Sequence, residues 1–396
     1  MKLRTLDEID VSGKKVLFRA DFNVPFAKKD HPATADDITD DFRIRATVPT
    51  IRAIIERGGI PVIIAHLGRP KGPDPLLSLR PVSERLSRLL EREVIFSADC
   101  IGESARGAIA KAKPGDVVFL ENVRFYDAET RNDPEFAKTL ASLGDVYVNE
   151  AFGDAHRAHA SMVGVPKLLP HAAGPLMIKE VDALSRIRDN PTRPLVAVMG
   201  GAKISTKMKF LEKFLPWVDM LLLGGALAST LVKAKGIEVG TSFIEDAAVD
   251  RLLRFDFNSS KVHVPVDVVL ADRPAADARI ATRSVYDVGD RESIYDIGPE
   301  TQALFGKIIR DAGTVFWNGP MGMHEVPVFS KGTESIAHSV ALSRGFSVVG
   351  GGDTTGMLER LGLDKKIGFI STGGGAMLEF LCGEELPALA ALARVS

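Results

Sequence analysis

The stretch Val348-Val349-Gly350-Gly351-Gly352 is a short apolar run that breaks into glycines. Four other runs in the second half of the chain break in the same way: Val198-Met199-Gly200-Gly201, Leu222-Leu223-Gly224-Gly225, Phe316-Trp317-Asn318-Gly319 and Ile370-Ser371-Thr372-Gly373-Gly374-Gly375. Ligands of open α/β sheets bind where the strands end, and bare glycine backbone lets phosphate groups approach closely spaced N–H donors. The second half therefore predicts a sheet that binds a nucleotide.

In the first half, comparable runs end at arginine or histidine. The endings are Leu17-Phe18-Arg19-Ala20-Asp21, Ala65-His66-Leu67-Gly68-Arg69, Glu121-Asn122-Val123-Arg124 and residues 149–159. A lone arginine is usually a solvated surface residue, but four lie at or just beyond strand ends: Arg43, Arg69, Arg124 and Arg157. Clustered guanidinium groups suit a small, highly anionic partner. The chain therefore predicts two sheets, one for each reactant.

The composition favours a soluble, cytoplasmic enzyme. A length of 396 residues suggests two or three domains at about 150 residues each. The net charge of −2 argues against general nucleic-acid binding, so the arginines are expected to act as a local site. Cys100 and Cys382 lie far apart and form no CxxC pair, which excludes a disulfide framework or zinc knuckle. We also expect no signal peptide and no membrane span.

Patterns typical of strands alternate with patterns typical of helices, which predicts parallel sheets with crossover helices. The expected strands cover residues 16–18, 60–65, 116–120 and 145–148. The expected helices cover residues 43–57, 83–93 and 175–188, the last of them joining the two halves.

Some candidate residues of the first half have a plain structural alternative. Asp21 and Asn23 could contact a substrate or simply form a turn, and local sequence favours neither role. His156 and His159 lie three residues apart, but no third metal ligand accompanies them, so a metal site is not favoured.

The second half contains neither G-x-x-x-x-G-K-[ST] nor G-x-G-x-x-G after a strand, which argues against a P-loop protein and a nicotinamide-dependent dehydrogenase. Lys203 and Lys207 are four residues apart and would lie on one face at the start of a helix. They could neutralise the charge of a bound phosphate, or they could simply be exposed lysines. Asp353 offers a hard oxygen to magnesium, or caps a helix. A non-catalytic anion-binding module would not explain these three residues. An aromatic content of 7% argues against a nucleic-acid binder.

Taken in order, the motifs resemble those of the phosphoglycerate kinase family over nearly the whole chain. Val16 to Pro25 matches the R-x-D-x-N-x-P signature of that family. The other matching stretches are residues 41–46, 66–70, 121–125, 151–161, 200–207, 317–322, 329–333, 350–354 and 371–376. The resemblance implies reversible phosphoryl transfer between 1,3-bisphosphoglycerate and ADP.

The resemblance also implies the site residues. Those expected to bind 3-phosphoglycerate are Asp21, Phe22, Asn23, Arg43, His66, Leu67, Gly68, Arg69, Arg124 and Arg157. Those expected to bind the nucleotide are Gly201, Lys207, Gly224, Gly225, Asn318, Glu325, Gly351, Gly352, Asp353 and Thr354. Asp353 would also bind Mg²⁺. The catalytic groups would be Arg43, Lys203 and the backbone N–H donors around Gly374, which stabilise the transferring phosphoryl group.

The implied architecture is α/β, with two Rossmann-like lobes joined by a helix and hinge and the active site in the cleft. We expect a substrate lobe over residues 1–172, a linker helix over 173–189 and a nucleotide lobe over 190–379. Residues 380–396 would pack back on the first lobe. The expected protein is a monomer that binds small molecules and Mg²⁺ with ATP or ADP, and neither nucleic acid nor membrane.

The chain departs from the family pattern in four places. Residues 28–37 look longer than the usual spacer. Glu150 stands where aspartate is common, Asp154 where threonine is common, and His324 where an aromatic residue such as phenylalanine is common. The last three adjoin expected site residues and therefore bear on affinity.

Overall fold

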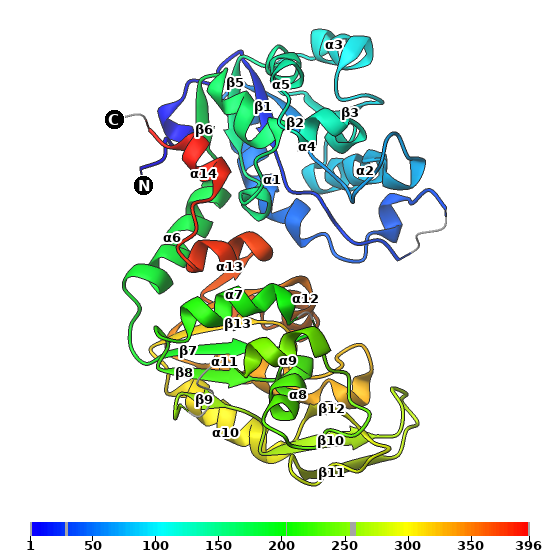
Figure 1. Ribbon diagram of the computed structural model, residues 1–396. Coiled ribbons are helices and arrows are strands. Elements are labelled where there is room, and N and C mark those ends of the chain that lie inside the picture. The colour runs from blue at the N-terminus through cyan, green and yellow to red at the C-terminus, as the bar shows by residue number, and fades with distance from the viewer. Residues whose placement is uncertain (1, 28–30, 203, 254–258, 395–396) are drawn as a thin grey trace. The chain divides into compact units, whose positions relative to one another are not determined.

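The computed structural model describes residues 2–27, 31–202, 204–253 and 259–394 (Figure 1). The chain divides into two compact units. The first unit extends to Asp182 and includes the segment that follows Glu384, and the second unit is Ala183–Glu384. Among the described helices, none is both long enough and apolar enough for a membrane crossing.

The first unit is built on a six-stranded parallel sheet with the order β3-β4-β2-β1-β5-β6. Its strands are β1 (Lys15–Arg19), β2 (Ile60–Ile64), β3 (Val94–Ser97), β4 (Val117–Leu120), β5 (Val146–Asn149) and β6 (His171–Ala173). The central β1 pairs Arg19 with Ile64 of β2 and with Asn149 of β5. The carboxyl ends of three strands are therefore level, and the loops that follow them start from one edge.

Helices α1 (Phe42–Glu56) and α2 (Arg80–Leu90) bury their apolar sides against one face of this sheet. Ile44 and Ile51 of α1 are seven residues apart, so both point to the same core as Phe18 and Phe119 of the strands. The unit also contains α3 (Gly102–Lys111), α4 (Asp127–Thr130), α5 (Pro134–Ala141), a π-helical turn (Ala160–Gly164) and α14 (Pro387–Leu392).

The second unit contains a six-stranded parallel sheet with the order β15-β14-β13-β7-β8-β9. Its strands are β7 (Leu195–Met199), β8 (Met220–Leu223), β9 (Val262–His263), β13 (Thr314–Asn318), β14 (Phe346–Gly350) and β15 (Phe369–Ser371). Its helices are α7 (Ser205–Phe214), α8 (Gly225–Ala234), α9 (Asp246–Leu252), α10 (Pro299–Arg310), α11 (Lys331–Leu342), α12 (Gly352–Arg360) and α13 (Gly375–Leu381).

Strand β13 contributes one large aromatic side chain to the core on each face of the sheet. Trp317 packs into a cluster with Phe305 of α10 and Ile336 of α11. Its neighbour Phe316 points the other way, and its ring lies 5.4 Å from that of Phe210 on α7. Helices on both sides thus cover the sheet, which leaves its carboxyl edge for the glycine turns.

A three-stranded antiparallel sheet in the second unit was not expected. It consists of β10 (Asp267–Ala271), β11 (Ile280–Ser284) and β12 (Ser293–Ile297), in the order β11-β10-β12. Antiparallel strands can be joined by short loops and need no crossover helix. The alternation of strand and helix patterns in the sequence therefore does not indicate this sheet. Val268, Leu270 and Val285 form their own small core with Val232 of α8.

Helix α6 (Pro175–Asp189) passes from the first unit into the second, since the division falls between Asp182 and Ala183. The chain returns to the first unit after α13. There the Ala388 amide donates to the Ala155 carbonyl at 3.1 Å, and Arg394 forms an ion pair with Glu8.

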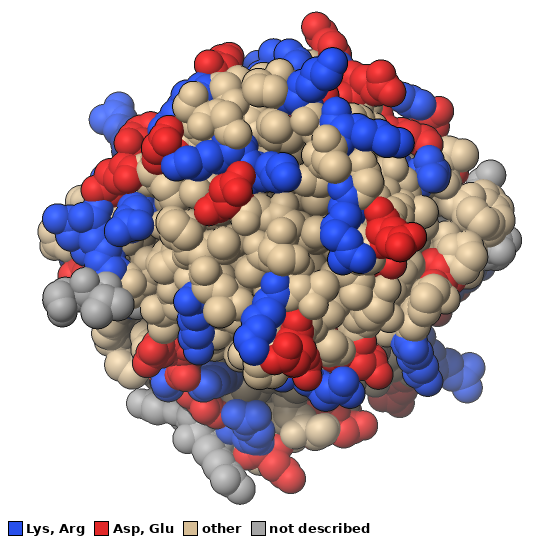
Figure 2. Space-filling view, turned by 90° about the horizontal axis from the view of Figure 1, so that it is seen from above, with Lys and Arg blue, Asp and Glu red and all other residues tan. Residues whose placement is uncertain are grey.

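The strands and helices expected from the sequence in the first half and at α6 are confirmed to within a few residues. On the face shown in Figure 2, acidic and basic side chains are interspersed, without a continuous patch of one sign.

Candidate active site

The loops after β1 and β2 bring several predicted anion-binding residues to one edge of the first sheet. Asp21 follows β1, and His66 follows β2, which is paired with β1 up to its last residue. The amide of Gly68 donates to Asn23 Oδ1 at 2.9 Å, which ties the two loops together. Arg43, in the first turn of α1, places NH1 2.7 Å from Asp21 Oδ2.

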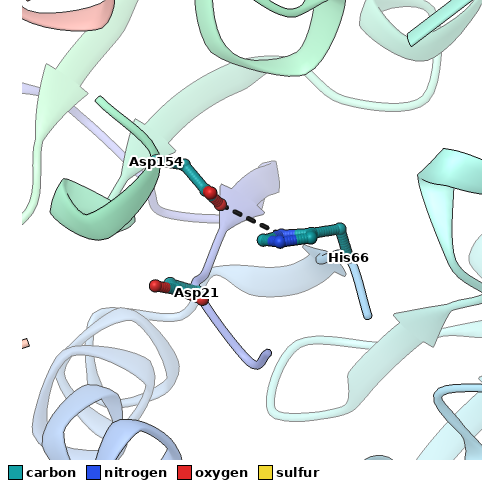
Figure 3. A group of neighbouring side chains, drawn as sticks. All are labelled: Asp21, His66 and Asp154. Carbon is teal, nitrogen blue, oxygen red and sulfur yellow. Dashed lines mark ion pairs between the residues drawn. The ribbon is translucent and has the colours of Figure 1, made fainter. Parts of the chain in front are cut away.

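Asp154 is the centre of a buried network behind this edge (Figure 3). Its Oδ2 accepts from Arg19 NH2 at 2.9 Å and from His66 Nδ1 at 3.0 Å, and its Oδ1 accepts from Arg157 NH1 at 2.7 Å. Burial alone would raise the pKa of Asp154, but the contact with His66 and the charges of Arg19 and Arg157 hold that pKa well below its usual range. The carboxylate therefore stays ionised.

Burial and the neighbouring arginines lower the pKa of His66, which favours a neutral ring. The 3.0 Å contact with Asp154 then places the proton on Nδ1, and the lone pair of Nε2 faces Arg157 NH1 at 3.4 Å. Asp21, His66 and Asp154 are close enough to suggest a metal site. However, guanidinium groups contact both carboxylates, so this edge attracts anions and repels cations.

Arg19 is fully buried and held from behind. Its Nε donates to Ser161 Oγ at 2.9 Å, and that hydroxyl donates to Glu129 Oε1 at 2.6 Å. Tyr147 OH donates to the carbonyl of Ser161 at 2.7 Å, which fixes the π-helical turn. The sequence analysis assigned no role to Glu129 or Ser161; the only signal was an arginine that ends an apolar strand.

Arg124 is a buried cation of this edge whose donors are only partly used among the described residues. It is buried, NH1 donates to the Gly68 carbonyl at 2.9 Å, and Nε has no hydrogen-bond partner among the described residues. Burial lowers the pKa of Arg124 to about 10. A buried guanidinium without a carboxylate in contact is arranged to receive an anion. The exposed Arg69 adds a second cation that is free to move.

Two residues expected to bind substrate have side chains that belong to the core. The ring of Phe22 is buried and stacks on Phe119 at 5.7 Å. Leu67 is also buried, and its amide and carbonyl are both bonded to the Asn122 side chain. Their side chains therefore position the loops and do not reach solvent.

In the second unit the glycine turns start from one edge as well. Asn318 of β13 pairs with Met199 of β7 and with Gly350 of β14, so the turns that follow are level. Gly201 and Gly351 have φ of +85° and +101°, a region that disfavours other residues. The turns also approach closely: a Cβ on Gly225 would lie 2.7 Å from the Gly201 nitrogen.

Hydrogen bonds fix these turns. The side-chain Nδ2 of Asn318 donates to the Gly350 carbonyl at 2.9 Å, and the backbone amide of Gly319 donates to Thr354 Oγ1 at 3.0 Å. Lys207 Nζ donates to the carbonyl of Gly200, and burial lowers the pKa of Lys207 to about 8. Its expected partner in catalysis, Lys203, lies outside the described residues.

A cavity of about 440 Å³ opens beside the turns and extends to the antiparallel sheet. Four of the expected nucleotide residues line it, namely Gly201, Gly225, Glu325 and Asp353. Apolar side chains that the sequence did not single out form much of its wall, among them Val232, Phe243, Val268 and Met321. Mostly apolar walls with a few polar groups are typical of a site for a small molecule.

Asp353 lies in the first turn of α12 and is 71% exposed at the mouth of this cavity. One carboxylate beside phosphate-binding turns fits Mg²⁺, which usually takes one or two carboxylates and completes its shell with phosphates and water. Gly352 opens the same helix. The expected donor Gly374 precedes α13 with φ of +49°, and the neighbouring Gly373 amide donates to Ser371 Oγ at 3.0 Å.

Two carboxylates of this unit were missed by the sequence analysis. Glu245 accepts from the Ile204 amide at 2.8 Å and so caps the start of α7. Asp296 lines the cavity wall and accepts from the Gly332 and Ile297 amides at 2.6 and 2.9 Å. Burial raises the pKa of Asp296 to about 7. Neither lies in a glycine turn, so no local pattern indicated them.

Comparison with known proteins gives consistent results. The family model described as phosphoglycerate kinase matches residues 6–384. Phosphoglycerate kinase from Salinispora tropica is 46% identical over 405 residues, covering 99% of this chain and all of the relative. The protein of that name from Nautilia profundicola is 43% identical and covers 99% of both chains.

Solved structures of phosphoglycerate kinases have the same fold. The structure from Coxiella burnetii superposes with a TM-score of 0.82 at 39% identity and covers 99% of both chains. The structure from Pyrococcus horikoshii superposes with a TM-score of 0.88 at 33% identity and covers 99% of this chain and 98% of its own.

Replacement of Asp154 by asparagine should destabilise the first unit. Arg19 would keep its charge without the carboxylate that balances it, and breaking a buried pair costs about 3–5 kcal/mol. Thermal unfolding followed by circular dichroism measures the loss. Asp10→Asn is the matched control, because its exposed pair with Lys14 should contribute little. Equal melting temperatures for the two variants would refute the central role of Asp154.

Proposed function

The chain belongs to the phosphoglycerate kinase family, a family of glycolytic phosphotransferases, and we propose how its residues transfer a phosphoryl group reversibly between 1,3-bisphosphoglycerate and ADP. The observation that carries this assignment is Arg124, a buried cation that has no carboxylate in contact among the described residues. Its unused donor requires an anionic ligand at the edge where the first sheet presents its arginines.

In this proposal the first unit binds 3-phosphoglycerate. Arg124 and Arg157 hold the phosphate by charge-assisted bonds, with Arg69 closing over it from solvent. Asp154 is paired with the buried Arg19 and His66 and with the partly exposed Arg157, so its charge is balanced and it orients Arg157 without repelling the ligand strongly. Asp21 and Asn23 contact the hydroxyl and carboxyl end. Phe22, Leu67 and Gly68 contribute by holding the loops in place, since the backbone groups of Leu67 and Gly68 are bonded to side chains of these loops.

The second unit binds the nucleotide. The cavity receives the nucleoside between its apolar walls, with Glu325 at the ribose and the backbone of Gly225 beneath; Gly224 precedes Gly225 directly after β8. Lys207 and the N–H groups of Gly351–Thr354 hold the phosphates, since α12 begins there and its N-terminus favours negative charge. Asp353 would hold Mg²⁺, which supplies further positive charge to the phosphates when bound.

The transfer itself needs positioning and charge neutralisation more than covalent catalysis. Arg43 approaches the transferring group from the first unit, while Lys203 and the N–H donors around Gly374 approach it from the second. The 2.7 Å bond to Asp21 keeps Arg43 extended toward the loop edge. Preorganised donors of this kind stabilise the charge that develops in the transition state.

We further propose that the enzyme acts as a cytoplasmic monomer. One chain carries both sets of binding residues, and its described cysteines, Cys100 and Cys382, are both free thiols, as a reducing compartment favours. Mixed charge on the face in Figure 2 supports small molecules, and neither nucleic acid nor membrane, as partners.

Arg124→Ala should weaken 3-phosphoglycerate binding by about 1.5–3 kcal/mol, the usual contribution of hydrogen bonds to a charged group. Affinity for ATP should stay unchanged, because Arg124 belongs to the other unit. Isothermal titration of both ligands measures the two effects. Arg106→Ala, an exposed arginine of α3, serves as the control. Equal losses for both ligands would mean that the variant is misfolded or the assignment is wrong.

Affinity for nucleotide should fall as the pH rises above about 8, where Lys207 loses its proton in the free enzyme. Bound phosphate favours the charged amine, so binding takes up a proton in this range. Titrations of ADP between pH 7 and 10 should show this slope in the wild type and not in Lys207→Met. Lys209→Met removes an exposed lysine from the same helix and should keep the slope; a slope retained by Lys207→Met would contradict this role.

We also propose that the enzyme bends at a hinge. Arg43 and Lys207 belong to different units, and both must contact the phosphates between which the phosphoryl group moves. Small-angle scattering should give a smaller radius of gyration with ADP and 3-phosphoglycerate together than with either alone. Arg124→Ala should show no such decrease at the same ligand concentrations. Identical curves for all states of an active wild-type enzyme would exclude closure.

A further inference from the structure

His324 occupies an unusual place in the second unit. It lies in the loop after β13, lines the 440 Å³ cavity and is only 10% exposed. Its Nδ1 is 3.3 Å from Glu325 Oε2, and its Nε2 is 3.9 Å from Asp353 Oδ1. The imidazole thus stands between two carboxylates that are each about 70% exposed at the cavity.

A role as a space-filling ring does not account for this arrangement. The Nδ1 atom is buried and makes no well-aligned hydrogen bond among the described residues, and a buried polar atom without a partner is costly. An aromatic hydrocarbon ring, which the sequence resemblance leads one to expect here, would fill the same volume without that cost. The ring thus leaves Nδ1 without a well-placed partner among the described residues and turns Nε2 toward Asp353.

The order of the three groups suggests that use. A carboxylate next to one ring nitrogen fixes the proton there and leaves the lone pair of the other nitrogen free, as in metal sites where a carboxylate supports a histidine ligand. Glu325 Oε2 lies 3.3 Å from Nδ1 without a well-aligned hydrogen bond, and a small rotation of this exposed carboxylate would let it accept the Nδ1 proton in a hydrogen bond. The 3.9 Å between Nε2 and Asp353 Oδ1 is too long for a hydrogen bond. One ion at about 2.0–2.2 Å from each atom can bridge such a gap.

We propose that His324 Nε2 is a second protein ligand, together with Asp353, for the divalent ion that accompanies the nucleotide. This inference rests on the proposed function, which places that ion at Asp353. Mg²⁺ prefers oxygen ligands, whereas imidazole suits first-row transition ions. The chain is therefore expected to favour Mn²⁺ over Mg²⁺ more strongly than the same chain with phenylalanine at this position.

The test uses the full-length protein, Mn²⁺ and ADP. Pulsed electron paramagnetic resonance of the Mn²⁺·ADP complex, with ¹⁵N-labelled histidine in the protein, should show a directly bonded ¹⁵N nucleus. His324→Phe should lose this signal, and His338→Phe, which removes an exposed histidine of α11, should keep it. By isothermal titration, His324→Phe should lower the ratio of Mn²⁺·ADP to Mg²⁺·ADP affinity by about tenfold or more.

The alternative outcomes separate the two proposals. If Mn²⁺·ADP binds to the wild type but no ¹⁵N coupling is seen, or if the coupling survives in His324→Phe, the histidine is not a ligand and the proposed function stands. If neither metal·ADP complex binds to the wild-type protein, the proposed nucleotide site is refuted, and so is the ligand role of His324.

Discussion

A guanidinium group at the centre of a buried sheet can remain in place only if carboxylates and hydroxyls replace the water it has lost. Arg19 meets this requirement with Asp154 on one side and with Ser161, backed by Glu129, on the other. The same Asp154 carboxylate orients His66 and Arg157. The anion-binding edge of the first unit thus depends on one charge balance that is hidden behind it.

In the proposed function, the two units bind anions in different ways. The first uses side-chain charge, with arginines on loops that leave one level edge of the sheet. The second uses backbone N–H groups in glycine turns and adds only a few charged groups, of which Lys207 is buried and easily neutralised. A compact phosphoglycerate needs several fixed cations, whereas a long polyphosphate can be held along helix N-termini and turns.

Two departures from the family pattern lie where the chemistry is most sensitive. Asp154 stands where the sequence resemblance leads one to expect threonine, behind the proposed anion site, and is paired with three cationic or hydrogen-bonding partners. His324 stands where the resemblance leads one to expect an aromatic ring, lines the cavity of the second unit and places its nitrogens toward two carboxylates. Each of the two residues puts a polar group in a buried place and makes contacts that an apolar or neutral side chain does not make.

The sequence by itself determined the two parallel sheets, the strand ends that carry arginines or glycines, and the residue types of both sites, because these follow from local periodicity and from turn chemistry. Only the tertiary structure decided that Phe22 and Leu67 point into the core, that the Nε of Arg124 has no hydrogen-bond partner among the described residues, and that Asp154 and Glu129 support Arg19. It also decided the antiparallel sheet that completes the cavity wall. The physical reason is that burial and charge pairing join residues more than a hundred positions apart, and no local pattern records which of them meet.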